Sequence, residues 1–147
     1  MKNYISIIIP TYNERENIVN LIRKIKLILS KSNVKYEIVV IDDNSPDMTA
    51  LEIRKEFRNN KNIRLFVRKR IKGLASAILF GINKAKGNII IGMDADFNHP
   101  PEKIITLIEE LKNNDLMIAS RFIKGGGMED KIRYIFTYIF NLFLKYF

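Results

Sequence analysis

Short apolar runs rich in β-branched residues alternate along the chain with longer segments in which apolar residues recur every three or four positions. The short runs predict buried strands, and the longer segments predict helices with one apolar face. Strands are expected over residues 4–9, 36–41, 62–67, 89–93 and 116–119. Helices are expected from the turn at 10–16 to about 30, and over about 48–58, 73–86 and 101–113. This alternation predicts an α/β fold, with a mostly parallel sheet flanked by helices on both faces.

The last segment of the chain has a different pattern. Over residues 129–147, aromatic and aliphatic residues alternate and a few basic residues lie among them. A helix that is apolar nearly all round either packs against other protein or lies in lipid, and both alternatives remain open for this segment. The sequence therefore predicts one domain over residues 1–128 and an aromatic amphipathic helix over 129–147. No apolar run reaches the length of about 18–20 residues that a membrane-spanning helix needs.

Composition narrows the possible partners. The 147 residues carry a formal net charge of +9 and contain no cysteine. The charge favours polyanionic partners such as nucleic acid, an anionic lipid surface or phosphorylated small molecules. No nucleic-acid-binding motif is recognisable, so no nucleic-acid partner is expected. Disulfides and thiolate metal sites are excluded. The apolar run near the N-terminus is too short for a signal peptide, and a cytoplasmic chain is expected.

Two carboxylates follow the predicted fourth strand. In an extended chain, the side chains of Asp94 and Asp96 point the same way, toward the carboxyl end of the sheet where α/β proteins bind ligands. Such a pair suits Mg²⁺, which takes one or two carboxylates and completes its shell with water and phosphate oxygens. The alternative is a polar turn that caps the helix starting near Pro101.

The other strand ends also carry polar groups, each with two interpretations. Asn13 and Glu16 have the spacing of a capping box for the first helix, and this turn lacks the glycines of a dinucleotide-binding loop. Residues 42–47 follow the second strand and are either a turn, with Asp47 as a helix cap, or contacts to a nucleobase or ribose. The basic run at residues 68–72 either holds phosphate or is a solvated loop. Arg121 would either neutralise a diphosphate or pair with a surface carboxylate.

Four motifs, taken in order, resemble those of family-2 glycosyltransferases, most closely the dolichol-phosphate mannosyltransferase and polyprenyl-phosphate glycosyltransferase branch. They are Pro10-Thr11-Tyr12-Asn13-Glu14-Arg15-Glu16-Asn17, Asp42-Asp43-Asn44-Ser45-Pro46-Asp47, Met93-Asp94-Ala95-Asp96-Phe97-Asn98-His99-Pro100, and Ser120-Arg121-Phe122 with Lys124-Gly125-Gly126-Gly127. The resemblance implies a GT-A fold and metal-dependent transfer of a sugar, typically mannose from GDP-mannose, to a polyprenyl or dolichyl phosphate. UDP-glucose is a second candidate donor. It also implies Mg²⁺ or Mn²⁺ as cofactor and peripheral contact with the cytoplasmic face of a membrane.

The resemblance also implies roles for particular residues. Pro10, Tyr12 and Glu14 would line the nucleotide pocket, Ile41 and Asp43 would sit against the base and ribose, Asp94 and Ala95 would contact the donor, Asp96 and Asn98 would bind the metal, and Arg121 would meet the diphosphate. Asp96, through the metal, and Arg121 would then stabilise the leaving nucleoside diphosphate. The single histidine, His99, is expected to be structural.

The chain also departs from the family pattern. The loop that usually reads Gly-Leu-Gly is Lys72-Gly73-Leu74-Ala75-Ser76, and the usual Gly-Trp after the triple glycine is absent. The acceptor-side motifs that family members carry further along are also missing, so the expected fold is a GT-A domain truncated after its donor-binding half. The alternative to an enzyme is a non-catalytic module that binds nucleotide sugar or docks on a membrane or partner.

Overall fold

The computed structural model describes residues 3–70 and 72–119. Two compact units are distinguished, Met1–Thr106 and Leu107–Phe147, and the sheet belongs to the first. The helix predicted over 129–147, the boundary predicted after residue 128 and the predicted site residue Arg121 lie outside the described residues. Among the described residues, no helix has the length and apolar character needed to cross a membrane.

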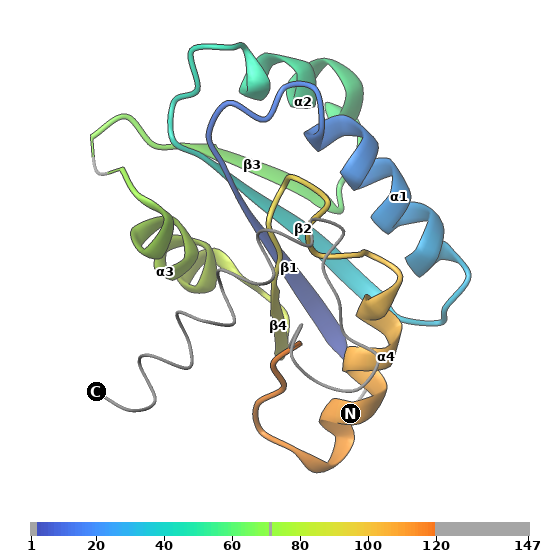
Figure 1. Cartoon of the computed structure of the whole chain (residues 1–147). Helices are drawn as coiled ribbons and strands as arrows, with labels where there is room; N and C mark the ends of the chain where they lie inside the picture. The colour runs from blue at the N-terminus through green and yellow to red at the C-terminus, as the bar shows by residue number, and fades with distance from the viewer. Residues whose placement is uncertain (1–2, 71, 120–147) are drawn as a thin grey trace, which may run out of the picture. The chain divides into compact units, whose positions relative to one another are not determined.

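A four-stranded parallel sheet forms the centre of the first unit (Figure 1). Its strands are β1 (Tyr4–Thr11), β2 (Lys35–Asp42), β3 (Ile63–Val67) and β4 (Ile89–Gly92), in the order β3-β2-β1-β4. The helices are α1 (Ile18–Ser30), α2 (Thr49–Phe57), α3 (Leu74–Lys84) and α4 (Lys103–Glu110), and a 3₁₀ turn follows at Leu111–Asn113. The predicted α/β architecture with a parallel sheet is confirmed.

Helices cover both faces of this sheet. Figure 1 shows α1 and α2 on one side and α3 on the other. Ile8, Val39, Ile41 and Ala77 form a buried cluster between the sheet and α3. Side chains alternate between the faces of a strand, so neighbouring residues of β1 and β2 serve different helices. For the same reason, the neighbouring acids Asp42 and Asp43 point to opposite faces of the sheet and contact different loops.

The fourth strand is less buried than its sequence predicts. β4 is an edge strand, and its residues are alternately half-buried and exposed. The sequence predicted a buried strand because an unbroken apolar run is typical of central parallel strands. Within residues 3–70 and 72–119 the strand order gives β4 one neighbour, β1, and Ile90 is 43% exposed, which the sequence could not show.

Two further predictions about elements are wrong. Residues 116–119 form no strand, and Leu116 and Ile118 are 74% and 75% exposed. A strand needs a neighbour that accepts its backbone hydrogen bonds, and an apolar pattern cannot supply that neighbour. The capping box of α1 is also absent: α1 begins at Ile18 after Asn17, which makes no side-chain capping hydrogen bond. Asn13 instead has a φ of 60°, in the left-handed region.

A buried polar network ties the C-terminal end of α3 to the sheet. Glu37 is 1% exposed, and its carboxylate accepts hydrogen bonds from Ser6 Oγ (2.7 Å), Arg64 Nη1 (2.8 Å) and the Lys86 backbone N–H (2.6 Å). Burial opposes ionisation of Glu37, but these hydrogen bonds outweigh it and hold the pKa of Glu37 below its ordinary value. Arg64 also donates to the Lys84 carbonyl, 2.7 Å away. The network therefore fixes the turn that leads from α3 into β4.

Candidate active site

A pocket of about 500 Å³ lies where β1, β2 and β4 reach their carboxyl ends. Parallel sheets bind ligands at this edge, because the loops that leave the strands open there. Seven of the predicted site residues line the pocket: Pro10, Tyr12, Glu14, Asp43, Asp94, Ala95 and Asp96. Thr11, Lys72, Gly73, Leu74 and Ala77 complete its wall. Residues that are far apart in the sequence thus share one cavity, although their individual roles stay predictions.

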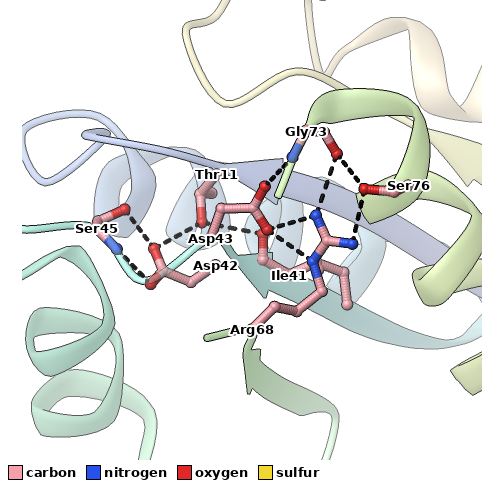
Figure 2. A network of polar contacts seen from close by, with 8 residues as sticks. All are labelled: Thr11, Ile41, Asp42, Asp43, Ser45, Arg68, Gly73 and Ser76. Carbon is pink, nitrogen blue, oxygen red and sulfur yellow. Dashed lines mark hydrogen bonds and ion pairs between the residues drawn. The ribbon is translucent and has the colours of Figure 1, made fainter. Parts of the chain in front are cut away.

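Asp42 and Asp43 point to different sides of the sheet and hold different loops in place (Figure 2). The Asp42 carboxylate accepts hydrogen bonds from Ser45 Oγ (2.6 Å), the Ser45 backbone N–H (3.0 Å) and Thr11 Oγ1 (3.2 Å). It is fully buried and faces away from the pocket. Of the two acids, only Asp43 is placed to meet a ligand.

The Asp43 carboxylate organises the loop between β3 and α3. Its Oδ1 accepts a hydrogen bond from Arg68 Nε (2.6 Å), and its Oδ2 accepts one from the Gly73 backbone N–H (2.7 Å). Arg68 also donates to Ser76 Oγ (3.0 Å) and to the Gly73 carbonyl (3.1 Å), as Figure 2 shows. Gly73 has a φ of 121°, which favours glycine. Arg68 and Gly73, at the two ends of this loop, are therefore both held by Asp43.

Sequence reasoning missed the role of Arg68. Arg68 was expected to be either a phosphate ligand or part of a solvated loop, yet it is 9% exposed and paired with Asp43. Arg68 directly follows a predicted strand, as Asp42 and Asp43 follow the neighbouring one. This shared position could have distinguished Arg68 from the other basic residues at 69–72. Lys69 and Arg70 are exposed, as the solvated alternative predicted. Lys72 lines the pocket, with its Nζ 5.6 Å from the centre of the Tyr12 ring.

The loop after β1 is held by two side chains from the loop after β2 and one from the first residue of α2. The backbone N–H groups of Asn13, Glu14 and Arg15 donate to Ser45 Oγ (3.0 Å), Thr49 Oγ1 (3.0 Å) and Asp47 Oδ2 (3.1 Å), respectively. These contacts replace the predicted capping box. They place Tyr12 and Glu14 in the pocket wall without any glycine in the turn.

Asp47 has two structural roles. With Ser45 and Thr49 it forms the clamp that holds the loop after β1, and it also accepts hydrogen bonds at the start of α2. Its Oδ1 accepts hydrogen bonds from the Thr49 hydroxyl (2.6 Å) and backbone N–H (3.0 Å). Partial burial raises the pKa of Asp47, but the hydrogen bonds from Thr49 and Arg15 outweigh that effect and hold it below its ordinary value. Asp47 thus has a structural role in the turn, but the prediction that it is the helix cap is wrong, because Met48, with a φ of 70°, is the residue that directly precedes α2.

The acidic loop after β4 folds back on itself. The backbone N–H of Asp94 donates to His99 Nδ1 (3.1 Å), and His99 Nε2 lies 3.5 Å from Asp94 Oδ2. Asp96 Oδ1 accepts a hydrogen bond from the Asn98 backbone N–H (3.0 Å), and the Asn98 side-chain amide also donates to Asp96. His99 has the structural role expected of it. The loop presents both carboxylates to the pocket, because Asp94 and Asp96 both line it.

The donor set fits a divalent cation that shares its coordination with a ligand. No group of three or more acidic, histidine or cysteine side chains that could hold a metal occurs in the described part of the chain. Asp94 and Asp96 nevertheless supply two hard oxygen ligands beside one pocket. Mg²⁺ and similar cations bind through one or two carboxylates when phosphate oxygens and water supply the other ligands. The residues therefore fit a metal that binds together with a phosphorylated ligand.

Two of the predicted site residues are not in the pocket wall. The Ile41 side chain is fully buried against Ile8 and Ala77 in the core, so its predicted contact with a nucleotide is not supported by this placement. The reason is strand alternation combined with α3, which covers that face of β2. Asn98 is exposed and points its amide nitrogen at Asp96, and it does not line the pocket.

A second hollow, of about 440 Å³, lies between α1 and α2 and away from the strand ends. Charged side chains of both signs line it, and they pair with one another: Arg15 with Glu52 at 3.3 Å and Arg23 with Glu56 at 2.7 Å. Four of its six charged side chains are used in these two pairs, and its basic and acidic residues are equal in number. The pocket at the strand ends is therefore the better candidate for an active site.

Two proteins with similar sequences carry the same activity in their names. A dolichol-phosphate mannosyltransferase of Pyrococcus furiosus is 46% identical over 127 residues, which are 86% of this chain and 35% of that protein. A dolichol-phosphate mannosyltransferase of Saccharomyces cerevisiae is 35% identical over 125 residues, which are 84% of this chain and 47% of that protein. The aligned region thus spans less than half the length of either relative.

Solved structures and a family model agree with these relatives. A mannosyltransferase from Pyrobaculum calidifontis, solved with GDP-mannose and Mn²⁺, superposes with a TM-score of 0.65 at 21% identity, over 82% of this chain and 37% of that one. A glucosyl-3-phosphoglycerate synthase from Mycobacterium tuberculosis, solved with Mn²⁺, UDP and phosphoglyceric acid, gives 0.62 at 22% identity, over 77% and 40%. At these identities the likeness shows the fold, which is GT-A. The model of glycosyl transferase family 2 matches residues 6–146, and the chain belongs to this family.

Proposed function

We propose that the pocket binds a nucleotide sugar together with a divalent cation, and that the chain contributes this donor site to the transfer of mannose from GDP-mannose to a polyprenyl or dolichyl phosphate. The observation that carries the proposal is the convergence of Asp94 and Asp96 with Tyr12 and Asp43 in one pocket. The relatives' names support the reaction class. The structural neighbour solved with GDP-mannose and Mn²⁺ supports the donor and the metal.

The residues divide between the two ends of the donor. Tyr12 is 53% exposed and offers its ring as a surface for the nucleoside. Asp43 receives three donor groups from Arg68 and Gly73, and a carboxylate has about four acceptor positions, so one remains for the base or ribose. Lys72, at the pocket wall, places a positive charge within reach of phosphate.

Asp94 and Asp96 would hold the cation at the diphosphate end, with Asn98 as a further oxygen ligand once its side chain turns away from Asp96. A bound Mg²⁺ or Mn²⁺ supplies Lewis-acid stabilisation of charge on the leaving diphosphate. Arg121 is proposed to act on the same charge, on the strength of the family resemblance. A phosphate acceptor is already anionic, so the reaction needs no strong general base in the pocket.

Calorimetric titration tests the donor site. GDP-mannose and UDP-glucose are each titrated with and without Mg²⁺ or Mn²⁺ into the wild type, Asp96→Ala and Asp115→Ala. Asp115 is an exposed acid outside the pocket wall and controls for the loss of one negative charge. We expect metal-dependent binding that Asp96→Ala weakens at least about tenfold and Asp115→Ala leaves intact, because removing a charged ligand of this kind costs more than about 1.4 kcal/mol. Equal binding without metal and in Asp96→Ala overturns the assignment.

A second candidate is a module that binds the donor without completing transfer. The aligned region spans 35% and 47% of the two relatives, so transfer by this chain alone requires a test of its own. This candidate predicts the same calorimetric result but no product. Incubation of the chain with GDP-mannose, metal and a polyprenyl phosphate separates the two: multiple turnover excludes the non-catalytic module.

A further inference from the structure

The net positive charge of this protein is accounted for by one segment. Residues 57–93, which contain β3, α3 and β4, carry nine lysines and arginines and no acidic residue. The whole chain has 25 basic and 16 acidic residues, so the remaining residues carry 16 of each and are neutral overall. The entire net charge of +9 therefore belongs to the part of the fold that includes α3.

The outward face of α3 is apolar. Ala77 and Gly81 are buried and face the sheet. Ala75, Leu79 and Ile82 follow one another at helical spacing on the other side of the helix, and all three are exposed, Leu79 at 61% and Ile82 at 40%. Surface helices normally present polar residues on this side. Apolar side chains therefore make up most of the outward face of α3, with Asn83 as an exposed polar residue beside Leu79.

β4 adds an exposed apolar residue on the same side of the sheet as α3. Ile90 pairs in register with Ser6, whose side chain bonds to the turn that leaves α3, so Ile90 points to the face that α3 covers. It is 43% exposed. A side chain at Gly92, two residues further along, would meet nothing within 4 Å. Within the described residues of the first unit, nothing covers this side of β4 next to Gly92.

Exposed cations lie at both ends of the apolar face. Lys69, Arg70 and Lys72 precede α3, and Lys84 and Lys86 close it. An apolar helix face flanked by lysines and arginines matches the interface of an anionic bilayer, where apolar side chains enter the headgroup region and cations meet lipid phosphates. Nucleic acid would use the cations but leave the apolar centre uncovered. We propose that the outward face of α3, defined by Ala75, Leu79 and Ile82 with these flanking cations, docks on an anionic membrane surface.

This face reaches the pocket. Lys72 and Leu74 line the pocket wall, and Leu74 is 61% exposed. A lipid-anchored phosphate could then approach the pocket along the docked side; this step alone rests on the proposed function. The docking itself does not, because vesicle binding is measured without donor, metal or acceptor.

Vesicle co-sedimentation tests the docking face. The full chain is mixed with phosphatidylcholine vesicles that contain or lack phosphatidylglycerol, at low and high salt. The test variant carries Leu79→Ser and Ile82→Ser. The matched control carries Leu27→Ser and Leu51→Ser, which remove side chains that are 59% and 54% exposed on α1 and α2. We expect at least about a tenfold loss of binding in the test variant, from lost apolar burial, and no loss in the control.

The cations give a second measurement. Lys69→Gln and Lys86→Gln should each weaken binding to the anionic vesicles by about fivefold at low salt, with a smaller effect at high salt. Loss with these variants, together with wild-type binding by the Leu79 and Ile82 variant, overturns the proposal, since purely electrostatic attachment needs no apolar face. Equal binding by the test and control variants overturns it as well.

Two other occupants of this face give distinguishable results. If another part of the polypeptide covers it, the Leu79 and Ile82 variant unfolds at a lower temperature than the control and sediments with vesicles like the wild type. If a second copy covers it, the wild type shows a concentration-dependent dimer by sedimentation velocity that this variant loses while its vesicle binding is unchanged. Either outcome overturns the proposal.

Discussion

Two arginine–carboxylate pairs, one at each end of α3, use the same chemistry for different purposes. At the C-terminal end of the helix, Arg64 bonds to Glu37, and at its N-terminal end Arg68 bonds to Asp43. Both acids come from β2 or the residue after it, and both arginines from β3 or the residue after it. The Glu37 pair lies where the strands begin, and the Asp43 pair lies where they end and the pocket opens.

This difference shows that position in a parallel sheet decides whether a buried ion pair can take part in binding. Loops at the carboxyl ends of the strands surround a crevice, whereas the opposite edge is closed by helix-to-strand turns. Glu37 has its hydrogen-bonding capacity used by Ser6, Arg64 and Lys86, and it does not line the pocket. Asp43 keeps its place in the pocket wall while it organises the loop around Arg68. Removing Glu37 should therefore affect the fold, and removing Asp43 should also affect the site.

The largest effect is expected from Gly87→Ala, next to the Glu37 network. An added Cβ would lie 2.5 Å from the Tyr4 carbonyl oxygen and 2.6 Å from the Ser6 nitrogen, and backbone atoms cannot rotate away. The turn and β1 would have to separate, at a cost of about 3 kcal/mol in the free energy of unfolding. Urea denaturation measures this loss. Gly92→Ala, where a Cβ has no neighbour within 4 Å, is the matched control and should change stability little.

Glu37→Gln is expected to cost about 2–3 kcal/mol, because Arg64 loses its charged partner and the amide cannot accept at both ends. The pKa of Glu37 is lower in the folded state than its ordinary value of 4.5, so the unfolded state binds the proton more readily. Its contribution is complete above pH 4.5 and is lost as the pH falls through the folded pKa.

Stability measured against pH checks the sign of this effect. The wild type should lose stability below pH 4.5 more steeply than Glu37→Gln, and the two curves should converge in acid. A difference between the two proteins that grows toward low pH would contradict the assigned direction. Donor affinity at neutral pH should be the same for both, since Glu37 lies at the edge of the sheet opposite the pocket.

Asp43→Asn distinguishes the roles of the two ion pairs at the ends of α3. The free energy of unfolding should fall by about 2 kcal/mol, because Arg68 is left buried without its charged partner. Unlike Glu37→Gln, this variant should also weaken donor binding at least about tenfold, since the loop around Gly73 forms part of the pocket wall. Calorimetry at a temperature where both variants are folded gives the comparison. Equal donor affinity in the two would remove Asp43 from the site.

Asp47→Asn tests the clamp between the loops after β1 and β2, with a smaller expected effect. The carboxylate accepts from Thr49 and from the Arg15 backbone, and an amide retains part of this capacity. Urea denaturation should show a loss of about 1 kcal/mol. Donor affinity should fall a few-fold, because Tyr12 and Glu14 are positioned by this loop. Unchanged affinity in spite of the lost stability would mean that the loop keeps its shape without the clamp.

The smallest effect is expected at the surface pair between α1 and α2. Arg23 and Glu56 lie 2.7 Å apart, but their side chains are 55% and 39% exposed. Exposed pairs of this kind contribute about 0–1 kcal/mol, so Glu56→Gln should change stability by less than about 0.5 kcal/mol. Donor binding should be unaffected. A loss as large as that in Glu37→Gln would show that the hollow between α1 and α2 has a structural importance that its exposure conceals.

Much of the fold and part of the site follow from local patterns. The β-branched runs predicted the four strands, and turn residues after the strands predicted the polar groups at the pocket. Seven of the predicted site residues share one pocket because parallel strands end at one edge. The exposure of β4, the missing strand at 116–119 and the buried place of Ile41 could not be predicted, because each depends on which strands are neighbours and which face a helix covers.

The sequence by itself determined the α/β alternation, the family and the acids that end the strands, because these depend on residue types and short-range spacing. Only the tertiary structure decided which contacts each of two neighbouring residues makes. Asp42 and Asp43 differ by one position, and the alternation of side chains sends one to the loops before α1 and α2 and the other to Arg68 and the pocket. The tertiary structure also gives the basic residues at 68–72 different surroundings. Arg68 is buried, Lys72 lines the pocket, and Lys69 and Arg70 are exposed beside the apolar face of α3.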